Sequence, residues 1–320
     1  MTRARIALVT PALASANNGN WQTASRWARF LSADYRVSLL ARWQGEPADL
    51  LVALHARRSA PSIAAWAAAA PRRPLIVVLT GTDLYRDIDS DADAQASLRL
   101  ADRLVVLNAL GARRLPEALR DKVRVCLQSA TARQTLAKSA RCLRVLMVGH
   151  LRAEKDPQTY LAAAEALAAR RDIAFDHIGE ALDPALGEQA RAWAARWPRY
   201  RWLGAMPHEA TRRRIQRAHV LVQASRMEGG AHTVIEALRS GTPVLASRID
   251  GNLGLLGDDY AGVFEPGDAA GLAALVARCR DDPAMLAQLQ QQCAARAPLF
   301  QPQRERATLL AIVAELLETR

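Results

Sequence analysis

The stretch VLMVGHLRAEKDPQTYLAAAEAL, residues 145–167, has the pattern of one strand, one turn and one helix. Its first four residues are apolar, which suits a buried strand, and Gly149 permits a tight turn after them. Asp156 is a favoured helix-capping residue, and Pro157 is favoured at the first position of a helix. The stretch therefore predicts a strand followed by a crossover helix, which is the repeating unit of a parallel sheet.

The same alternation of short apolar strands and longer helical stretches recurs along the chain. The first half has expected strands at residues 4–10, 35–41, 49–55, 74–80, 102–108 and 122–128. The second half has expected strands at 143–149, 174–180, 200–204, 219–225, 242–247 and 262–265. Expected helices lie at 21–31, 63–70, 94–101, 109–119, 157–169, 184–196, 208–217, 233–240, 270–278, 283–295 and 305–317. Because strands and helices alternate regularly, we expect an α/β protein with two doubly wound, Rossmann-like domains.

Two domains also suit the length of 320 residues, because one hydrophobic core rarely serves a chain of this size. We place an N-terminal domain at 1–140 and a C-terminal domain at 141–300. The polar stretch 129–142 has no clear apolar period and is the expected linker. The last segment, 301–320, contains an amphipathic helix that we expect to cross back onto the first domain.

Arginine carries almost all of the net charge of +11, since Lys122, Lys138 and Lys155 are the only lysines. An excess of positive charge suits an anionic partner, such as a phosphorylated small molecule. The arginines are spread along the chain, and aromatic residues make up only 5% of it. We therefore do not expect a nucleic-acid interface, which interleaves basic residues with stacking residues.

The cysteines are expected to be reduced residues of a cytoplasmic protein. They show no CxxC pairing and no histidine at zinc-ligand spacing: Cys126, Cys142, Cys279 and Cys293. The N-terminus begins with a charged region, but its apolar run is short and Pro11 interrupts it, so we expect a strand at 5–10 rather than a leader. No stretch approaches the roughly 20 apolar residues of a membrane-spanning helix, so we expect no stable membrane insertion.

Three basic side chains gather where the strand at 143–149 ends. His150, Arg152 and Lys155 lie between that strand and the helix that begins near Pro157. Free backbone N–H groups, the helix dipole and the side-chain charges all favour a phosphate there. The alternative is that these residues only decorate a solvated loop.

Two glutamates, Glu228 and Glu236, flank a glycine pair and a helix start in SRMEGGAHTVIEALRSGTPVLAS, residues 225–247. Carboxylates accept hydrogen bonds from hydroxyls, glycines allow a close backbone approach, and a helix start attracts phosphate. Vicinal hydroxyls together with a diphosphate describe a nucleotide sugar. Taken alone, the segment is better interpreted as an ordinary strand and helix with one surface glutamate and one helix glutamate.

The pairing of VGHLRAEKD with SRMEGGAHTVIEALRSGTPVLAS, joined by WLGAMPHEATRRRIQRAHVLVQAS, resembles the GT-B glycosyltransferases of family 4. The resemblance covers residues 143–265 well and implies a GT-B fold, in which two Rossmann-like domains face a central cleft. It also implies that Glu228 meets sugar hydroxyls, that Glu236 holds the ribose, and that Lys155 binds the diphosphate.

Further donor contacts are implied by the same resemblance. The backbone near the sugar and diphosphate is that of Gly149, Gly229, Gly230, Ala231, His232 and Thr233. The turn at Ala205 and Met206 borders the base. Family members usually carry arginine five residues before the lysine, whereas this chain has His150, so Arg152 is the alternative diphosphate ligand.

The N-terminal half is expected to bind the acceptor. Gly19, Asn20 and Trp21 stand at a helix start in GNWQTA, where the family has a glycine-rich loop near the donor diphosphate. Gly19 and Asn20 are therefore expected donor contacts, and Trp21 is an acceptor candidate. The alternative is a polar turn with Trp21 in the core. The remaining acceptor candidates follow two strands, at their carboxyl ends: His55, Arg57, Thr80, Thr82, Asp83 and Arg86. A lone histidine at a strand end, such as His55, is as often structural.

The strings GNWQTA, LTGTDLYRD, GHLRAEKDP and EGGAHTVIEA are similar to those of one subfamily, the selenosugar synthases of selenoneine pathways. That resemblance implies transfer of a hexose from UDP-GlcNAc or UDP-glucose to selenophosphate, with formation of a carbon–selenium bond. It also implies catalytic roles for Lys155, Glu228 and His150. The sequence has no DxD-like acidic cluster at a strand end, so we expect neither a metal ion nor another cofactor.

Several alternatives stay open from the sequence. The acceptor could be a sugar or a small alcohol, as in other members of family 4. A UDP-sugar epimerase and a non-catalytic nucleotide-sugar binder share the expected fold. The general acid or base could be His150 or His232, and the preferred hexose, the anomeric outcome and the oligomeric state are not determined.

Overall fold

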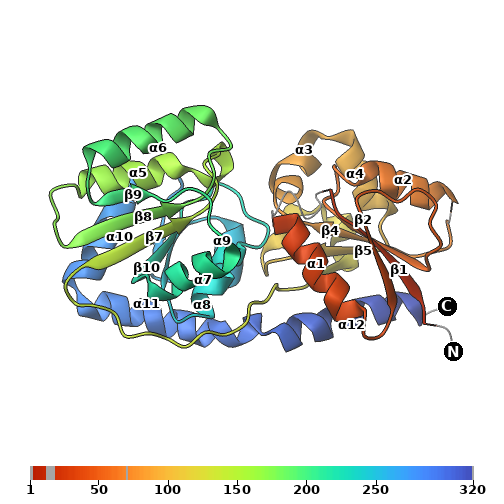
Figure 1. Cartoon of the computed structure of the whole chain (residues 1–320). Helices are drawn as coiled ribbons and strands as arrows, with labels where there is room; N and C mark the ends of the chain where they lie inside the picture. The colour runs from red at the N-terminus through yellow and green to blue at the C-terminus, as the bar shows by residue number, and fades with distance from the viewer. Residues whose placement is uncertain (1–2, 12–18, 70, 319–320) are drawn as a thin grey trace. The chain divides into compact units, whose positions relative to one another are not determined.

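The computed structural model describes residues 3–11, 19–69 and 71–318, which form two compact units (Figure 1). The first unit comprises Met1–Gln128, Glu228–Gly230 and Pro302–Arg320. The second unit comprises Ser129–Met227 and Ala231–Gln301. Each unit is thus assembled from separate pieces of the chain and is built around one six-stranded sheet.

The first sheet is parallel throughout, with the strand order β2-β1-β3-β4-β5-β6. Its strands are β1 (Arg5–Val9), β2 (Arg36–Leu40), β3 (Leu50–Leu54), β4 (Leu75–Leu79), β5 (Arg103–Val106) and β6 (Val123–Val125). The chain winds in both directions from β1, as expected of a doubly wound sheet. All six strands predicted for this half are confirmed.

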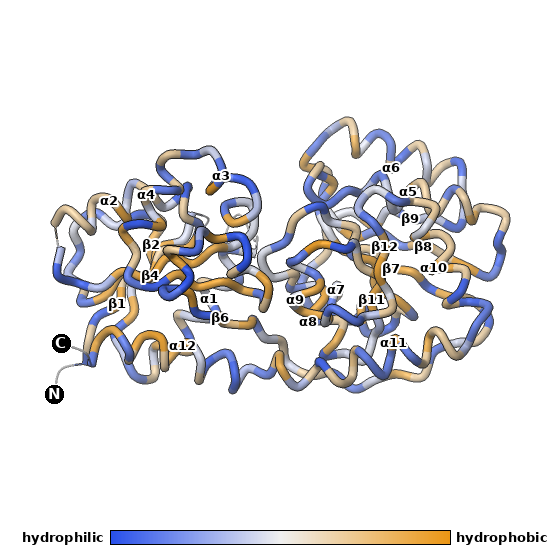
Figure 2. The backbone as a smooth tube through the Cα atoms, turned by 180° about the vertical axis from the view of Figure 1, so that it is seen from behind, coloured by the Kyte–Doolittle hydropathy of each residue, from blue (hydrophilic) through white to orange (hydrophobic). Residues whose placement is uncertain are grey.

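Helices cover both faces of the first sheet. They are α1 (Gly19–Leu31), α2 (Ala60–Ala69), α3 (Ile88–Ser90), α4 (Ala92–Leu100) and α12 (Pro302–Leu317). Because successive strand residues point to opposite faces, Leu8 shares one core cluster with Trp27 and Leu309, from α1 and α12. Val9 belongs to the opposite cluster, together with Trp66 of α2. The central strands β3 and β4 are buried at every position, and β4 is hydrophobic throughout (Figure 2), whereas the edge strand β2 is partly exposed.

The C-terminal helix α12 is bound to the first unit by polar contacts as well. Glu305 is 1% exposed, and its carboxylate accepts hydrogen bonds from Arg26 Nε at 2.8 Å and Trp27 Nε1 at 2.7 Å. Further along α12, Glu315 accepts a hydrogen bond from Arg103 at 2.5 Å. These contacts fix the angle and register at which α12 lies on the sheet.

The second sheet is also parallel, with the order β12-β11-β10-β7-β8-β9. Its strands are β7 (Leu143–Val148), β8 (Ile173–Ile178), β9 (Tyr200–Trp202), β10 (Val220–Gln223), β11 (Val244–Ser247) and β12 (Val263–Phe264). Its helices are α5 (Pro157–Ala166), α6 (Pro184–Arg196), α7 (His208–Arg217), α8 (His232–Leu238), α9 (Asp250–Leu256), α10 (Ala269–Asp281) and α11 (Pro283–Arg296). The strand order again reverses at β7, so the carboxyl ends of β7 and β10 meet where ligands bind in such sheets.

One predicted helix is wrong. The stretch 109–119 contains two short 3-10 turns, Gly111–Arg114 and Glu117–Lys122, rather than one α-helix. Pro116 lies between them, and a proline disfavours helical backbone at the residue before it. The sequence analysis also missed the π-helical turn η2 (Asp83–Asp87) and α9, because both are too short to show an apolar period.

The connection between the first unit and β7 has no regular structure. Residues 126–139 form neither helix nor strand, and they include most of the expected linker, 129–142. The first unit gives way to the second at Gln128, ahead of residue 140, where the sequence analysis sets the boundary. The first unit then resumes at Pro302, so that α12 lies far in sequence from its packing partners.

Candidate functional site

The loop after β7 gathers the basic residues expected to bind a diphosphate. Lys155 ends a single 3-10 turn, Ala153–Lys155, between β7 and α5. A Cβ added at Gly149 would lie 3.5 Å from the Lys155 side-chain carbons, so the two ends of the loop meet. Asp156 then caps α5, with its Oδ1 accepting a hydrogen bond from the Thr159 amide at 3.3 Å. This cap fixes the point at which the loop ends and α5 begins.

His150 occupies the position where the family usually has arginine. Its Nδ1 accepts a hydrogen bond from the Glu180 amide at 3.2 Å. Burial lowers the pKa of His150, and the positive charge of Arg152 lowers it further. The imidazole is therefore neutral near pH 7, with its proton on Nε2, and supplies a hydrogen-bond donor without a positive charge. Arg152 brings a positive charge to the loop, and its buried Nε has no hydrogen-bond partner among the described residues.

A buried histidine supports this loop from behind. His177 Nε2 lies 3.1 Å from the Gly149 carbonyl oxygen, and burial lowers the pKa of His177 to about 4. The neutral ring therefore donates to that carbonyl. The backbone of Gly179 comes so close that a Cβ there would lie 1.9 Å from the same oxygen. Only glycine fits at this crossing, which holds Gly149 against the end of β8.

Glu236 lies one turn into α8 and is 2% exposed. His208 Nε2 donates to Glu236 Oε1 at 2.6 Å, while His232 Nδ1 and Arg212 Nη1 lie 3.4 and 3.7 Å from the same oxygen. Burial alone would raise the pKa of Glu236, but the hydrogen bond from His208 and its other positive neighbours hold it at about 2. The hydrogen bond from His208 reaches Oε1, and no hydrogen bond from another described side chain reaches Oε2.

The sequence analysis did not identify His208 and Arg212 as site residues. They are four positions apart in α7 and so share one face of that helix. The hydrogen bond to Glu236 raises the pKa of His208, so its proton is held to higher pH than in an ordinary histidine. A signal was available, because α7 starts just after Ala205 and Met206, the turn that the family resemblance assigns to the base.

Two side chains at the start of α8 make hydrogen bonds within the second unit. Thr233 Oγ1 donates to Gln223 Oε1 at 2.9 Å, and His232 Nε2 lies 3.1 Å from the Ser129 carbonyl oxygen. Ala231, which precedes the helix, provides no capping side chain. The two side chains expected near the diphosphate thus also anchor α8 to β10 and to the linker.

The glycine pair after Glu228 packs against the first unit, to which residues 228–230 belong. Asn108 Nδ2 donates to the Gly229 carbonyl oxygen at 2.7 Å. A Cβ at Gly229 would lie 2.3 Å from the Thr80 carbonyl oxygen, so a side chain is excluded there. Glu228 itself is 9% exposed. The glycines are therefore required for backbone packing, and their approach to a sugar remains a prediction.

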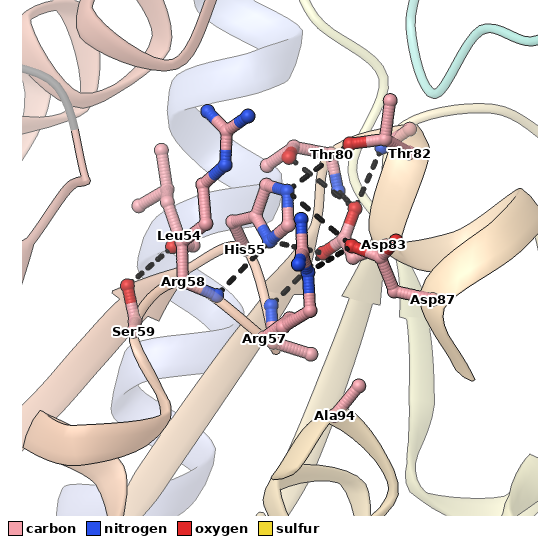
Figure 3. A network of polar contacts seen from close by, with 12 residues as sticks. Leu54, His55, Arg57, Arg58, Ser59, Thr80, Thr82, Asp83, Asp87 and Ala94 are labelled. Atoms are coloured by element: carbon pink, nitrogen blue, oxygen red, sulfur yellow. Dashed lines mark hydrogen bonds and ion pairs between the residues drawn. The ribbon is translucent and has the colours of Figure 1, made fainter. Parts of the chain in front are cut away.

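Within the first unit, the loops after β3 and β4 form one polar network (Figure 3). Asp83 is fully buried, and its carboxylate accepts hydrogen bonds at 2.9 Å from the amides of Ala56, Thr80 and Gly81. One carboxylate thus ties the two loops together. Asp83 was expected to bind the acceptor, but both of its carboxylate oxygens accept hydrogen bonds from backbone amides.

His55 stands at the centre of this network (Figure 3). It is 1% exposed and adopts φ 72°, a left-handed conformation that is uncommon for a residue other than glycine. Its Nδ1 accepts a hydrogen bond from the Arg58 amide at 3.3 Å, and its Nε2 lies 3.1 Å from Thr82 Oγ1. Burial lowers the pKa of His55. A neutral ring with Nδ1 occupied carries its proton on Nε2 and donates it to Thr82.

Two expected arginines, Arg57 and Arg86, meet on a carboxylate that the sequence analysis missed. Arg57 Nε donates to Asp87 Oδ2 at 2.8 Å, and Arg86 Nε donates to Asp87 Oδ1 at 3.0 Å. Burial alone would raise the pKa of Asp87, but the two arginines lower it. Asp87 therefore stays ionised and holds both guanidinium groups at the carboxyl ends of β3 and β4.

The remaining candidates, Gly19, Asn20 and Trp21, form the first turn of α1. Thr23 Oγ1 donates to the Gly19 carbonyl oxygen at 2.8 Å, which secures this turn. Trp21 is half-buried, and Gly19 is exposed. The residues of the expected glycine-rich loop that precede Gly19 lie outside the described residues.

Two kinds of feature are absent from the described residues. None of the described helices combines the length and the apolar character needed to cross a bilayer. In the same part of the chain, no three His, Cys, Asp or Glu side chains lie close enough together to hold a metal ion.

Several solved structures share the fold over almost the whole chain. A sucrose-phosphate synthase from Thermosynechococcus elongatus has a TM-score of 0.79 at 17% identity, covering 99% of this chain and 100% of that one. HepE from Anabaena in complex with UDP-glucose has a TM-score of 0.77 at 15% identity, covering 98% and 100%. An E. coli structure described as trehalose-6-phosphate bound with UDP-2-fluoro glucose has a TM-score of 0.77 at 11% identity, covering 98% and 99%.

These likenesses establish the GT-B fold, which the sequence analysis predicted. No curated protein sequence matches the chain. The family described as Glycosyl transferases group 1 matches residues 128–298, which is more than half of the chain and includes both the Lys155 loop and Glu236. The chain therefore belongs to the glycosyl transferases of group 1.

Proposed function

We propose that this glycosyltransferase transfers a hexose, GlcNAc or glucose, from a UDP-sugar to selenophosphate. The observation that carries the donor part is the setting of Glu236. This carboxylate is buried and ionised, and its contacts hold one oxygen, so that the other can accept hydrogen bonds from the vicinal hydroxyls of a ribose. The UDP-glucose in the HepE complex supports the same donor class here.

The diphosphate of the donor would lie against the loop after β7. Lys155 and Arg152 supply positive charge there, and neutral His150 supplies an Nε2 hydrogen bond. Developing negative charge on the departing diphosphate is stabilised by such fixed groups without a metal ion. In this proposal Lys155 and His150 act on the leaving group, and Glu228 holds hydroxyls of the transferred hexose.

Two observations support selenophosphate as the acceptor. The sequence resembles selenosugar synthases in both halves, and the first unit carries a cluster of arginines at the carboxyl ends of β3 and β4. In the reaction, the anomeric C1–O bond breaks and its electron pair leaves with UDP. A lone pair of selenium then forms the C1–Se bond, which gives a hexosyl selenophosphate. Attack of water on its phosphorus breaks the Se–P bond and releases phosphate and the selenosugar. Selenophosphate is already an anion at neutral pH, so no strong general base is needed.

The proposal is tested by incubating the purified protein with selenophosphate and an equimolar mixture of UDP-GlcNAc and UDP-glucose. Mass spectrometry should detect UDP and a selenium-bearing hexose, whose mass shows which donor was used. A parallel reaction replaces selenophosphate with a panel of sugars and small alcohols. If only that panel yields product, the acceptor assignment is wrong while the transferase activity stands. If the donor is consumed in neither reaction, the UDP-sugar assignment is wrong as well.

A further inference from the structure

We propose that Arg57, Arg86 and the hydroxyl of Thr82 form a subsite for a small tetrahedral oxyanion in the first unit. In this subsite Asp87 positions the two arginines and His55 positions the threonine. The ligand class is phosphate, thiophosphate or selenophosphate. The inference rests on the proposed function only for the identity of the natural acceptor, because the oxyanion chemistry follows from contacts within the first unit.

The arginines supply the charge of the subsite. Each donates through Nε to a different oxygen of Asp87, so one carboxylate orients two guanidinium groups. Their side chains are 39% and 47% exposed, whereas that of Asp87 is 6% exposed. Guanidinium groups carry positive charge and match the spacing of oxyanion oxygens, so the pair suits an anion.

The direction of the Thr82 hydroxyl follows from a chain of hydrogen bonds that starts at the backbone. The Arg58 amide donates to His55 Nδ1, which places the proton of the neutral ring on Nε2. That proton is donated to Thr82 Oγ1, whose lone pair is then occupied. Thr82 Oγ1 has no other hydrogen-bond partner among the described residues, and the side chain is half-buried. Its own hydrogen can therefore be donated to an oxyanion.

The backbone is arranged to keep these groups in place. The strands β3 and β4 are neighbours in the parallel sheet, so the loops that follow them share the edge where ligands bind. The Asp83 carboxylate joins the two loops by accepting hydrogen bonds from three backbone amides, and these bonds stabilise its negative charge. His55 is held in its strained conformation at the same point, as is common at functional sites.

Isothermal titration calorimetry with thiophosphate tests the subsite. Saturating UDP is present throughout, so that the diphosphate site of the second unit is occupied. Arg57→Ala should raise the dissociation constant about tenfold or more, the usual effect of losing a charged hydrogen bond. Thr82→Val keeps the shape but removes the hydroxyl and should raise it several-fold, whereas Thr82→Ser should bind like the parent. Arg114→Ala is the matched control, because it breaks an exposed arginine pair with Asp89 in the same unit.

A double-mutant cycle tests the role of His55. Asparagine tolerates positive φ but is too short to reach Thr82, so His55→Asn should weaken thiophosphate binding. The double variant with Thr82→Val should lose no more than Thr82→Val alone, because both changes remove the same donated hydrogen. Fully additive losses would assign His55 a merely structural role and overturn its positioning role.

The outcomes separate this inference from the proposed function. Thiophosphate affinity that is unchanged in both Arg57→Ala and Thr82→Val overturns the subsite, even if selenosugar is formed. No thiophosphate binding by the parent overturns it too. Conversely, binding that weakens as expected supports the subsite even if no selenosugar forms, and then only the acceptor assignment fails.

Discussion

At the scale of single residues, burial and neighbouring groups shift the pKa values of two histidines of the second unit in opposite directions. His150 is partly buried beside Arg152, so its pKa is lowered and the ring is neutral near pH 7. His208 donates to the Glu236 carboxylate, so its pKa is raised. Of the two, His208 keeps its positive charge to higher pH. That charge lies beside Glu236, the proposed ribose ligand, and not in the proposed diphosphate site.

This difference leads to a prediction about the diphosphate site. Lys155→Ala removes a full positive charge from the loop, so the dissociation constant for the UDP-sugar should rise about tenfold or more. His150→Ala removes a neutral donor and should have a smaller effect. Calorimetric titration of each variant with the UDP-sugar measures both values. Equal affinities in the two variants and the parent would contradict a diphosphate role for Lys155.

A second prediction concerns the hydrogen bond between His208 and Glu236. In Glu236→Gln the pKa of His208 should fall towards its ordinary value of 6.5, and UDP should bind more weakly. NMR titration of the histidine ring protons measures the pKa. His219 serves as the control, because burial rather than a carboxylate shifts its pKa. An unchanged His208 titration would mean that the pair does not form in solution.

The sign of the pH dependence follows from the same pair. The pKa of His208 is raised on folding, so its contribution to stability is fully present below pH 6.5 and is lost as pH rises through the pKa of the folded state. The pKa of Glu236 is lowered to about 2, so its contribution is present above pH 4.5 and is lost as pH falls towards 2. The ion pair between His208 and Glu236 therefore contributes most to stability between pH 4.5 and pH 6.5.

The sequence predicted the site residues that follow strands but not those that pair with them. Lys155 and Glu236 could be proposed as ligands from the sequence, because motif spacing and strand ends single them out. His208 and Asp87 were missed because their importance depends on partners that are distant in sequence or oriented by the fold. His208 meets Glu236 only once α7 and α8 are packed side by side, and no local pattern records that packing.

At the scale of elements, the contact between α1 and α12 depends on one buried carboxylate. Glu305 of α12 accepts hydrogen bonds from Arg26 and Trp27 of α1. The side chain of Arg26 is only 13% exposed, so solvent screens this ion pair poorly. Since α1 begins with Gly19 and Asn20, the same carboxylate fixes the helix that carries two proposed donor-binding residues.

Glu305→Gln should therefore destabilise the first unit. Breaking a buried ion pair leaves the arginine uncompensated, and we expect a loss of about 3 kcal/mol in the free energy of unfolding. Denaturant titration followed by tryptophan fluorescence measures it. The matched control is Asp34→Asn, which breaks the exposed pair between Asp34 and Arg306 of α12 and should cost less than about 1 kcal/mol. Similar losses in both variants would contradict the role of burial.

Most elements were predictable, and the failures have local causes. Every strand was found, because the central strands are short, continuous apolar runs and the edge strands lie at the same regular spacing between helical stretches. The helix at 109–119 failed because Pro116 breaks a stretch that otherwise has helical composition. The turn Asp83–Asp87 was missed because one carboxylate, Asp83, organises it through backbone amides, which leaves no periodic signal.

At the scale of the whole molecule, two consecutive wound domains could be predicted from the repeated strand and helix pattern. The return of the last helix to the first unit was also expected, because an amphipathic helix needs an apolar surface to cover. The assignment of residues 228–230 to the first unit was not expected. The glycines of this segment were interpreted from the sequence as ligand contacts. In the structure, Gly229 also packs against the Thr80 carbonyl oxygen, where a side chain would not fit.

The interrupted first unit has a consequence for how the protein is made on the ribosome. Domains generally fold as units, the N-terminal one first, as the chain emerges. Here Leu309, Ile312 and Val313 complete the cluster around Trp27, so the face of the N-terminal sheet that α1 covers in part is not fully covered until they are synthesised. The second unit, which ends at Gln301, emerges in full before that. The order of completion is therefore reversed, and the half that is translated first is the last to close its core.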